Sequence, residues 1–226
     1  ASFRPIELVS KSAPADLTKL TIDGAANAEI YVAESANSLV QLAQTELQKF
    51  VKQISGAELP IVSEHPGKGL EIVLATPDTV PEIKELFADD LEWIGDTDGF
   101  AVRTLDNKIY IMANESRGVL NGVYDFLSEN AGIIWTRANE DLGTLYNPQA
   151  TIAVTKTDYL EIPDFSVRGC GPNGQSDGAT FNKMLARNKQ NSVTATTYES
   201  ALTDGTYAAF KNVGLQPLLL GHVMSN

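Results

Sequence analysis

Residues 98–135, DGFAVRTLDNKIYIMANESRGVLNGVYDFLSENAGIIW, carry the strongest fold signal of the chain. Apolar and polar residues alternate around Phe100 and again around Ile109, which is the pattern of half-buried β-strands. Asp106 and Asn107 lie between the two patterns and are typical turn residues. The sequence therefore predicts two strands joined by a short turn.

A helix is predicted directly after these two strands. Asn114 is a typical N-cap residue, and Gly132 is typical of the position just beyond a helix C-terminus. The apolar residues between them that share one helical face are Val119, Val123, Phe126 and Leu127. A short apolar strand ending at Trp135 completes a compact unit of sheet and helix.

Two further helices are predicted upstream. The more regular one is expected to be capped by Asn37 or Ser38 and to end at Gly56, because its apolar residues recur at helical spacing. Those residues are Leu39, Ala43, Leu47, Phe50 and Ile54. A short helix is expected from Thr79, with Pro81 in its first turn, to about residue 87.

Several short apolar or alternating segments in the first part of the chain are predicted strands. They are 20–22, 30–32, 59–62, 70–75 and 151–155. Segment 59–62 is expected at a sheet edge, because Pro60 cannot donate a backbone hydrogen bond. Segment 70–75 is apolar almost throughout and is expected in a more central position.

The pattern changes near Pro163. Strands are predicted at 165–168, 193–197 and 215–221, separated by helices at 181–189 and 207–213. This alternation is typical of parallel strands joined by crossover helices. Three such strands are too few for an eight-stranded barrel, so a fragment of a longer protein, ending at Asn226, is expected.

Composition limits the possible partners. The 226 residues include 17 Lys and Arg against 29 Asp and Glu, a formal net charge of −12. An acidic surface repels nucleic acid and anionic membranes and is compatible with neutral sugars. The single cysteine, Cys170, excludes an intramolecular disulfide and a Cys-rich zinc site. No segment approaches the roughly 20 apolar residues needed to cross a bilayer, and Ala1 in place of Met indicates a removed leader or tag.

No cofactor or metal site is predicted. The sequence contains neither a phosphate-loop or dinucleotide-binding motif nor a serine nucleophile elbow. Its two histidines, His65 and His222, are far apart and have no acidic residues at metal-ligand spacing. His65 is expected on the surface. The acidic pairs at 89–90 and 140–141 are interpreted as solvated loop charges.

Several short motifs in the first part occur in a characteristic order. They are Ala43 to Leu47, Ile54-Ser55-Gly56, Leu59-Pro60, 70–75, Asp98-Gly99-Phe100 and RGVLNGVYDFL at 117–127. No single motif is specific, but their order and spacing together resemble a known module. This module is the N-terminal domain that precedes the catalytic barrel of α-glucuronidases, β-N-acetylhexosaminidases and related glycoside hydrolases.

The second part resembles the start of that barrel. The matching segments are FSVRG at 165–169, MLARNKQN at 184–191 and 214–222, which resemble strand one, the first helix with the turn into strand two, and strand three. The resemblance implies that Arg168 and His222 contact the sugar. Tyr198 and Glu199 stand where the family has an Asp-rich stretch, and are added as substrate-binding candidates. The catalytic acids of hexosaminidases follow strand four, beyond Asn226, so no catalytic residue is predicted and α-glucuronidase-like chemistry is equally open.

Each candidate also has a structural interpretation. The guanidinium of Arg168 suits vicinal hydroxyls or a uronate carboxylate, and equally a salt bridge that ties its strand to a neighbouring loop. Glu199 follows a predicted barrel strand at the end where barrel sites are built, but it and His222 could also be surface residues. Trp135 is expected in the core, although with Trp93 it could stack on a sugar.

We therefore expect an α+β domain over residues 1–160, a mixed sheet with two long helices, followed over 161–226 by the first strands and helices of a (β/α)8 TIM barrel. The predicted function is the N-terminal part of a glycoside hydrolase acting on a polysaccharide or glycan, inactive as a fragment. Carbohydrate is the expected partner, and the resemblance implies a secreted or periplasmic location. A non-enzymatic carbohydrate-binding or scaffold module and a small self-contained α/β binding protein remain as alternatives.

Overall fold

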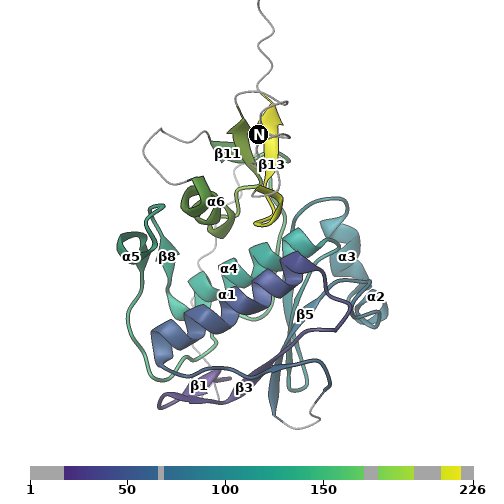
Figure 1. Ribbon diagram of the computed structural model, residues 1–226. Coiled ribbons are helices and arrows are strands. Elements are labelled where there is room, and N and C mark those ends of the chain that lie inside the picture. The colour runs from purple at the N-terminus through teal and green to yellow at the C-terminus, as the bar shows by residue number, and fades with distance from the viewer. Residues whose placement is uncertain (1–17, 66–68, 171–177, 196–209, 220–226) are drawn as a thin grey trace, which may run out of the picture.

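The main layer of the molecule is a six-stranded mixed sheet (Figure 1). The computed structural model describes residues 18–65, 69–170, 178–195 and 210–219. In sheet order the strands are β10 (Tyr159–Glu161), β6 (Phe100–Leu105), β7 (Lys108–Met112), β5 (Leu70–Ala75), β3 (Ala28–Tyr31) and β4 (Ile61–Val62). Strands β7, β5, β3 and β4 run parallel, whereas β6 pairs antiparallel with both β7 and β10. The expected mixed α+β fold is confirmed.

The strand predictions for this sheet are confirmed at its centre and at its edge. Strand β5 lies between β7 and β3 and is buried from its second residue onward, which explains its continuous apolar sequence. Strand β4 lies at the edge, directly after Pro60. The predicted hairpin is formed by β6 and β7, and Asp106 in its turn has a positive φ of 54°.

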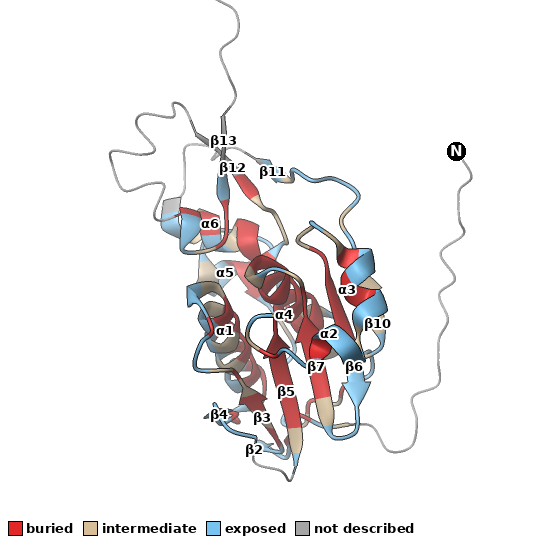
Figure 2. Ribbon diagram, turned by 90° about the vertical axis from the view of Figure 1, so that its right-hand side faces the viewer, coloured by how far each residue is buried: buried red, intermediate tan, exposed pale blue. Residues whose placement is uncertain are grey.

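Two pairs of helices cover the two faces of the sheet. Helices α1 (Ser38–Ser55) and α4 (Ser116–Ala131) pack on the face that carries Ile72 and Leu74. Helices α2 (Ile83–Leu86) and α3 (Ala88–Ile94) pack on the face that carries Val73 and Ala75. Because alternate residues of a strand point to opposite faces, one apolar strand supplies two cores. Figure 2 shows the central strands buried between these layers.

The helix ends are partly as predicted. The side chain of Asn37 accepts hydrogen bonds from the amides of Leu39 and Val40, and α1 ends at Gly56 with a φ of 82°. Helix α4 likewise ends at Gly132, with a φ of 66°. The predicted N-cap Asn114 is wrong, because α4 begins one residue later, after Glu115.

Asn114 instead closes a helix that was not predicted. Its side-chain amide donates to the carbonyls of Leu91 and Gly95, at 2.8 and 2.9 Å, at the C-terminal end of α3. The short helix α2 begins at Ile83, later than predicted, because the hydroxyl of Thr79 accepts from the amide of Thr76 in a turn before it. Both helix starts therefore differ from the prediction, and the side chain expected at each start is bonded elsewhere.

A second, three-stranded sheet follows the first part of the chain. Its strands are β11 (Gly169–Cys170), β12 (Ser192–Ala195) and β13 (Gln216–Leu219), and helix α6 (Gly178–Arg187) lies between the first two. All pairs are parallel, with Gly169, Ser192 and Gln216 in register. Two of the three predicted parallel strands, those at 193–197 and 215–221, are confirmed over their described residues. Of the helix predicted at 207–213, residues 210–211 are helical. Residues 196–197, 207–209 and 220–221 lie outside the described residues.

The predicted strand at 165–168 is wrong, because pairing begins only at Gly169. Phe165 is 72% exposed and Val167 54% exposed, so the apolar residues that indicated a strand do not enter a core. The backbone amide of Arg168 is taken by the side chain of Asn191, at 2.8 Å, rather than by a neighbouring strand. The sheet therefore starts after Arg168, not before it.

The remaining elements are short hairpins at the margins. Strand β1 (Thr21–Ile22) pairs with β2 (Ala25–Ala26), and β8 (Ile134–Trp135) pairs with β9 (Thr144–Leu145) around α5 (Glu140–Gly143). The predicted strand at 151–155 is wrong, since only an isolated bridge joins Ala153 to Lys19. Among the described residues, no helix is both long and apolar enough to cross a membrane.

Candidate functional site

The candidate site is the junction between the two sheets. In Figure 1 the strands of the second sheet lie above helices α1 and α4, and β13 runs upward, away from these helices. The residues that contact the first part of the chain lie just before the amino ends of β11 and β12 or at the end of α6: Arg168, Arg187, Lys189 and the carbonyl of Gln190. The carboxyl ends of the strands, where parallel α/β sheets usually carry ligand sites, are on the far side.

The first of three ion-pair clusters at this junction is centred on Asp98. Its carboxylate accepts from Arg168 Nη2 at 2.5 Å and from Arg117 Nε at 3.1 Å, and all three side chains are largely buried. Burial by itself would raise the pKa of the Asp98 carboxyl, but the hydrogen bond from Arg168 and the charges of both guanidinium groups outweigh it and hold this pKa below its ordinary value. The carboxylate is therefore charged at neutral pH.

The second cluster joins α1, α4, α5 and α6. Arg187 donates two hydrogen bonds to Glu46, at 2.8 and 3.1 Å, and a third to Glu140 at 3.2 Å. The hydroxyl of Tyr124 donates to Glu46 as well, at 3.2 Å. The guanidinium of Arg187 also lies 4.9 Å from the ring centre of Phe50. Every charge in this buried group has a partner of opposite sign.

The third cluster is centred on Lys189. Its ammonium lies 2.6 Å from Asp125 Oδ1 on α4 and 2.7 Å from Glu161 Oε1 on the edge strand β10. Burial would lower the pKa of Lys189, but the hydrogen bonds to both carboxylates outweigh it and raise the pKa. One lysine thus connects α6 to two separate elements of the first sheet.

In the ion pairs that cross the junction, the cations come from the side of the parallel strands and the anions from the side of the six-stranded sheet. The cations on the side of the parallel strands are Arg168, Arg187 and Lys189, and their partners on the side of the six-stranded sheet are Asp98, Glu46, Glu140, Asp125 and Glu161. Opposed charges of this kind specify one relative orientation of two surfaces, because a rotated arrangement leaves buried charges unpaired. The junction is therefore built to hold a defined geometry.

A small polar cavity of about 260 Å³ opens beside the first cluster. It is lined by Asp96, Thr97, Asp98, Glu115, Arg117, Ser166, Asn191 and Gln216. Asp98 and Arg117 are already paired with each other, and the side-chain amide of Asn191 is bonded to Ser166 O and the backbone amide of Arg168. Much of the lining thus serves the junction itself.

Of the four predicted substrate-binding residues, the structure describes one. The guanidinium of Arg168 contacts Asp98, the carbonyl of Lys189 at 3.0 Å and the carbonyl of Phe165 at 2.8 Å. It lies at the amino end of its strand and forms the ion pair that its structural interpretation predicts. Its contact with sugar stays a prediction. Tyr198, Glu199 and His222 lie outside the described residues.

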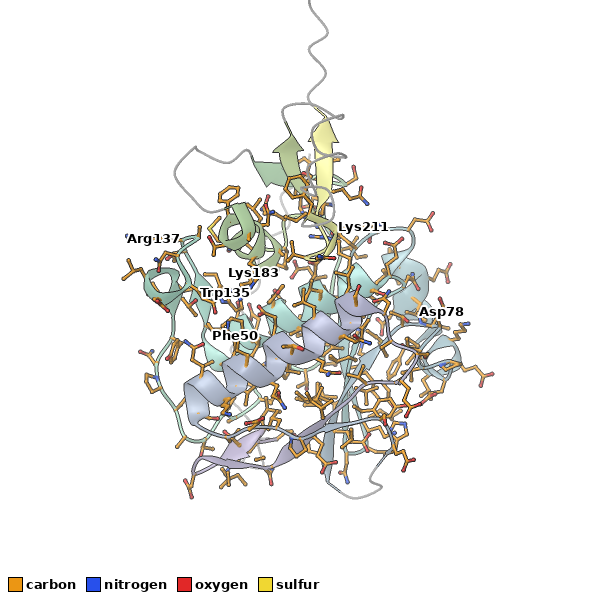
Figure 3. The ribbon with its side chains drawn as sticks, viewed as in Figure 1. Phe50, Asp78, Trp135, Arg137, Lys183 and Lys211 are labelled. Carbon is orange, nitrogen blue, oxygen red and sulfur yellow. The ribbon has the colours of Figure 1, made fainter. Side chains whose placement is uncertain are left out.

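The other singled-out residues are distributed between core and surface. Trp135 is buried, and its ring centre lies 5.2 Å from that of Phe50, so its core interpretation is confirmed. Both residues are labelled in Figure 3. Trp93 is 71% exposed on α3. His65 is partly exposed, stacks on Tyr31 at 4.0 Å and contacts Glu71 at 2.8 Å.

The interpretation of the two acidic pairs as solvated loop charges is wrong for Asp90 and Glu140, whereas Asp89 and Asp141 are exposed. Asp90 lies on α3, is buried, and accepts from Arg103 Nε and Nη2 at 2.9 and 2.7 Å. Glu140 lies on α5 and takes part in the second cluster. The sequence analysis also did not identify Asp98, Glu46 or Lys189 as functional residues, because their ion-pair partners are distant in sequence.

The part of the chain that the structure describes holds no group of His, Cys, Asp and Glu side chains arranged to bind a metal ion.

A pH-dependent test follows from the Asp98 cluster. We expect Asp98→Asn to lower the free energy of unfolding at pH 7 by about 2 kcal/mol, because two buried guanidinium groups lose their anion. Since the folded pKa is below the ordinary value of 3.8, this contribution is complete above that pH and is lost as pH falls through the folded pKa. Urea unfolding of both proteins at pH 7, 5 and 3 measures the difference. If the difference in unfolding free energy between wild type and Asp98→Asn grows as the pH falls, the expected loss of the Asp98 contribution at low pH is contradicted.

Comparisons with known proteins agree on one type of domain. Residues 16–126 match the family model described as Glycosyl hydrolase family 67 N-terminus. No curated protein matches the sequence. The solved structure of BtGH115A, described as a GH115 4-O-methyl-α-glucuronidase with specificity for decorated arabinogalactans, is similar with a TM-score of 0.64 and 17% identity. That match covers 87% of this chain and 29% of the other.

Two further solved structures are similar at a TM-score of 0.50. A mutant β-hexosaminidase of Streptomyces plicatus, in complex with the product GlcNAc, is 14% identical, with 80% of this chain and 32% of that one covered. A chitobiase of Flavobacterium johnsoniae is 13% identical, with 89% and 32% covered. The chain thus spans about a third of the length of the structures it matches. The predicted resemblance to the N-terminal region of α-glucuronidase- and hexosaminidase-like glycoside hydrolases is confirmed.

Proposed function

We propose that this chain is the N-terminal part of a carbohydrate-active hydrolase that cleaves glycosidic bonds in a polysaccharide or glycan. Residues 1–160 form the α+β accessory domain in this proposal, and 161–226 are the first strands and helices of a (β/α)8 barrel. The observation that carries it is the parallel register of β11, β12 and β13 in a sheet of their own, in a chain whose residues 16–126 match the Glycosyl hydrolase family 67 N-terminus. Parallel strands joined through helices are the repeating unit of such a barrel.

The proposed substrate site lies at the carboxyl ends of the parallel strands. Tyr198 and Glu199 follow β12 in sequence, and His222 follows β13. Glycoside hydrolysis requires two carboxyl groups about 5–10 Å apart on either side of the scissile bond. The acids at the described junction are bound to Arg and Lys side chains and lie at the amino ends, so they support the junction rather than the reaction. We therefore propose that these 226 residues alone are inactive.

The alternative is a non-enzymatic carbohydrate-binding module. The exposure of Trp93 and of Phe165 (71% and 72%) favours it, because exposed aromatic rings can stack on sugar faces. Both proposals have carbohydrate as the partner. A secreted or periplasmic location, which the family resemblance implies, is proposed with them.

Turnover assays distinguish these functions. The 226-residue chain and the longest natural form of the protein are tested with aryl α-glucuronides and aryl β-N-acetylhexosaminides, and for retention on immobilised polysaccharide. Hydrolysis by the longer form alone supports the proposal. Retention without hydrolysis by either form supports the binding module, and hydrolysis by the 226-residue chain refutes the claim that it is inactive.

A further inference from the structure

Lys189 has a left-handed backbone conformation, with a φ of 56°, that residues other than glycine and asparagine rarely adopt. It follows the C-terminus of α6, where its amide donates to Ala186 O and the amide of Gln190 donates to Leu185 O, both at 3.0 Å. This pair of bonds is the Schellman motif, which usually places glycine at the position of Lys189. Both long helices of this chain end on glycine in the same conformation. A lysine retained against its own backbone preference indicates a role for the side chain.

The side chain of Lys189 spans the junction. Its ammonium contacts both Asp125 on α4 and Glu161 on β10, within 2.7 Å, and lies 6.0 Å from the ring centre of Phe100. The second oxygen of Asp125 is buried and has no other hydrogen-bond partner. Loss of the ammonium therefore leaves one buried carboxylate uncompensated and releases α6 from the edge strand.

The backbone around Lys189 sets the start of two parallel strands. Its carbonyl accepts from Arg168 Nε at 3.0 Å, and the Arg168 carbonyl accepts from the amides of Asn191 and Ser192 at 2.8 and 2.9 Å. The side-chain oxygen of Asn191 accepts a hydrogen bond from the amide of Arg168. The entries into β11 and β12 are thus tied to each other within a few residues of Lys189.

We propose that Lys189 is a positioning residue: its ammonium fixes the start of β12 against α4 and β10, and thereby fixes where the carboxyl end of β12 lies relative to the six-stranded sheet. A strand is stiff along its length, so a displacement at Ser192 is carried to Ala195 and to the residues that follow it. Tyr198 and Glu199 are three and four residues further in sequence. The effect on substrate rests on the proposed function, whereas the effect on the strand does not.

Four variants of the 226-residue chain test the effect on the strand. Lys189→Gly removes the ammonium and relieves the backbone, Lys189→Arg keeps a cation, and Glu161→Gln keeps the lysine but removes one of its anions. Lys183→Met removes a cation from an exposed position on the same helix and is the matched control. Amide hydrogen exchange of β12 and of the central strand β5, and the urea midpoint, are measured for each variant at pH 7.

The two measurements distinguish a local effect of Lys189 on the start of β12 from an effect on the overall stability of the chain. In Lys189→Gly the urea midpoint falls, because buried Asp125 loses its cation. The β12 amides are expected to exchange on the order of tenfold faster beyond the change seen in the central strand β5, because the strand entry opens locally. Lys189→Arg restores most of the protection, Glu161→Gln loses part of it, and Lys183→Met changes neither quantity. Unchanged exchange in Lys189→Gly, or no restoration by Lys189→Arg, overturns the proposal. Equal losses of amide protection in β12 and in the central strand β5 assign Lys189 a purely stabilising role and also overturn the proposal.

The same variants in the longest natural form test the consequence for substrate. Lys189→Gly is expected to lower kcat/KM on the order of tenfold or more, chiefly through KM, because displaced substrate contacts weaken binding. Equal kinetics in wild type and Lys189→Gly contradict the substrate consequence. If the wild type hydrolyses no glycoside, the proposed function fails, and the amide exchange measurement still decides whether Lys189 positions β12.

Discussion

Replacing Arg187 by Met is expected to lower the free energy of unfolding by about 3–5 kcal/mol at pH 7. The side chains of Arg187 and Glu46 are only 4% and 8% exposed, and Arg187 supplies two hydrogen bonds to Glu46. Without it, the Glu46 carboxylate remains buried with the Tyr124 hydroxyl as a neutral donor. Desolvation of an uncompensated charge is the physical cause. Urea unfolding followed by circular dichroism measures the change.

The matched control for Arg187→Met is Lys52→Met on the exposed side of α1. Lys52 pairs with Glu58, but both side chains are more than half exposed, so its loss is expected to cost no more than about 1 kcal/mol. The double variant with Met at both 46 and 187 is expected to recover much of the stability, because no isolated charge remains buried. If Arg187→Met costs no more than Lys52→Met, the buried pair does not stabilise the junction.

Replacing Gly118 by Ala is expected to cost about 3 kcal/mol, although alanine is the better helix former. A Cβ at this position would lie 2.4 Å from the carbonyl oxygen of Gly99 and 2.5 Å from the Cβ of Ala113. Neither group is the flexible end of a side chain, so α4 must move away from the start of β6. That movement disturbs the ion pair of Asp98 with Arg117, both next to the contact. Thermal and urea unfolding measure the loss.

Gly132→Ala separates steric from conformational effects. A Cβ there meets nothing within 4 Å, but the φ of 66° disfavours alanine, so a cost of about 1 kcal/mol is expected. Gly118 has no positive φ and is affected only through the close approach of helix and strand. A Gly118→Ala variant as stable as Gly132→Ala would show that α4 can shift without loss.

Elements defined by neighbouring residues were predictable. Helix α1 has its N-cap Asn37, its apolar stripe and its final Gly56 within 20 residues of one another, and the structure has all three. The hairpin of β6 and β7 and the central strand β5 are equally local. Resemblance between short motifs also identified the type of N-terminal domain, because such motifs keep their order along the chain.

Errors occurred where a distant residue competed for a local group. Asn114 has the sequence of an N-cap, but the C-terminal end of α3 takes its side-chain amide. Residues 165–168 alternate like a strand, but Asn191 takes the amide of Arg168. In both cases the competitor becomes a neighbour only in the folded chain, so no pattern within the segment reveals it.

The ion pairs of the junction were even less predictable from the sequence than these elements. The ion pair of Glu46 with Arg187 joins residues 141 positions apart, and that of Asp98 with Arg168 joins residues 70 apart. Periodicity and capping act over one or two turns of chain, and they were enough to determine the main helices and the central and edge positions of β5 and β4. Which charges meet is governed by packing of the two sheets, because burial makes pairing obligatory only after the chain has brought those groups out of water.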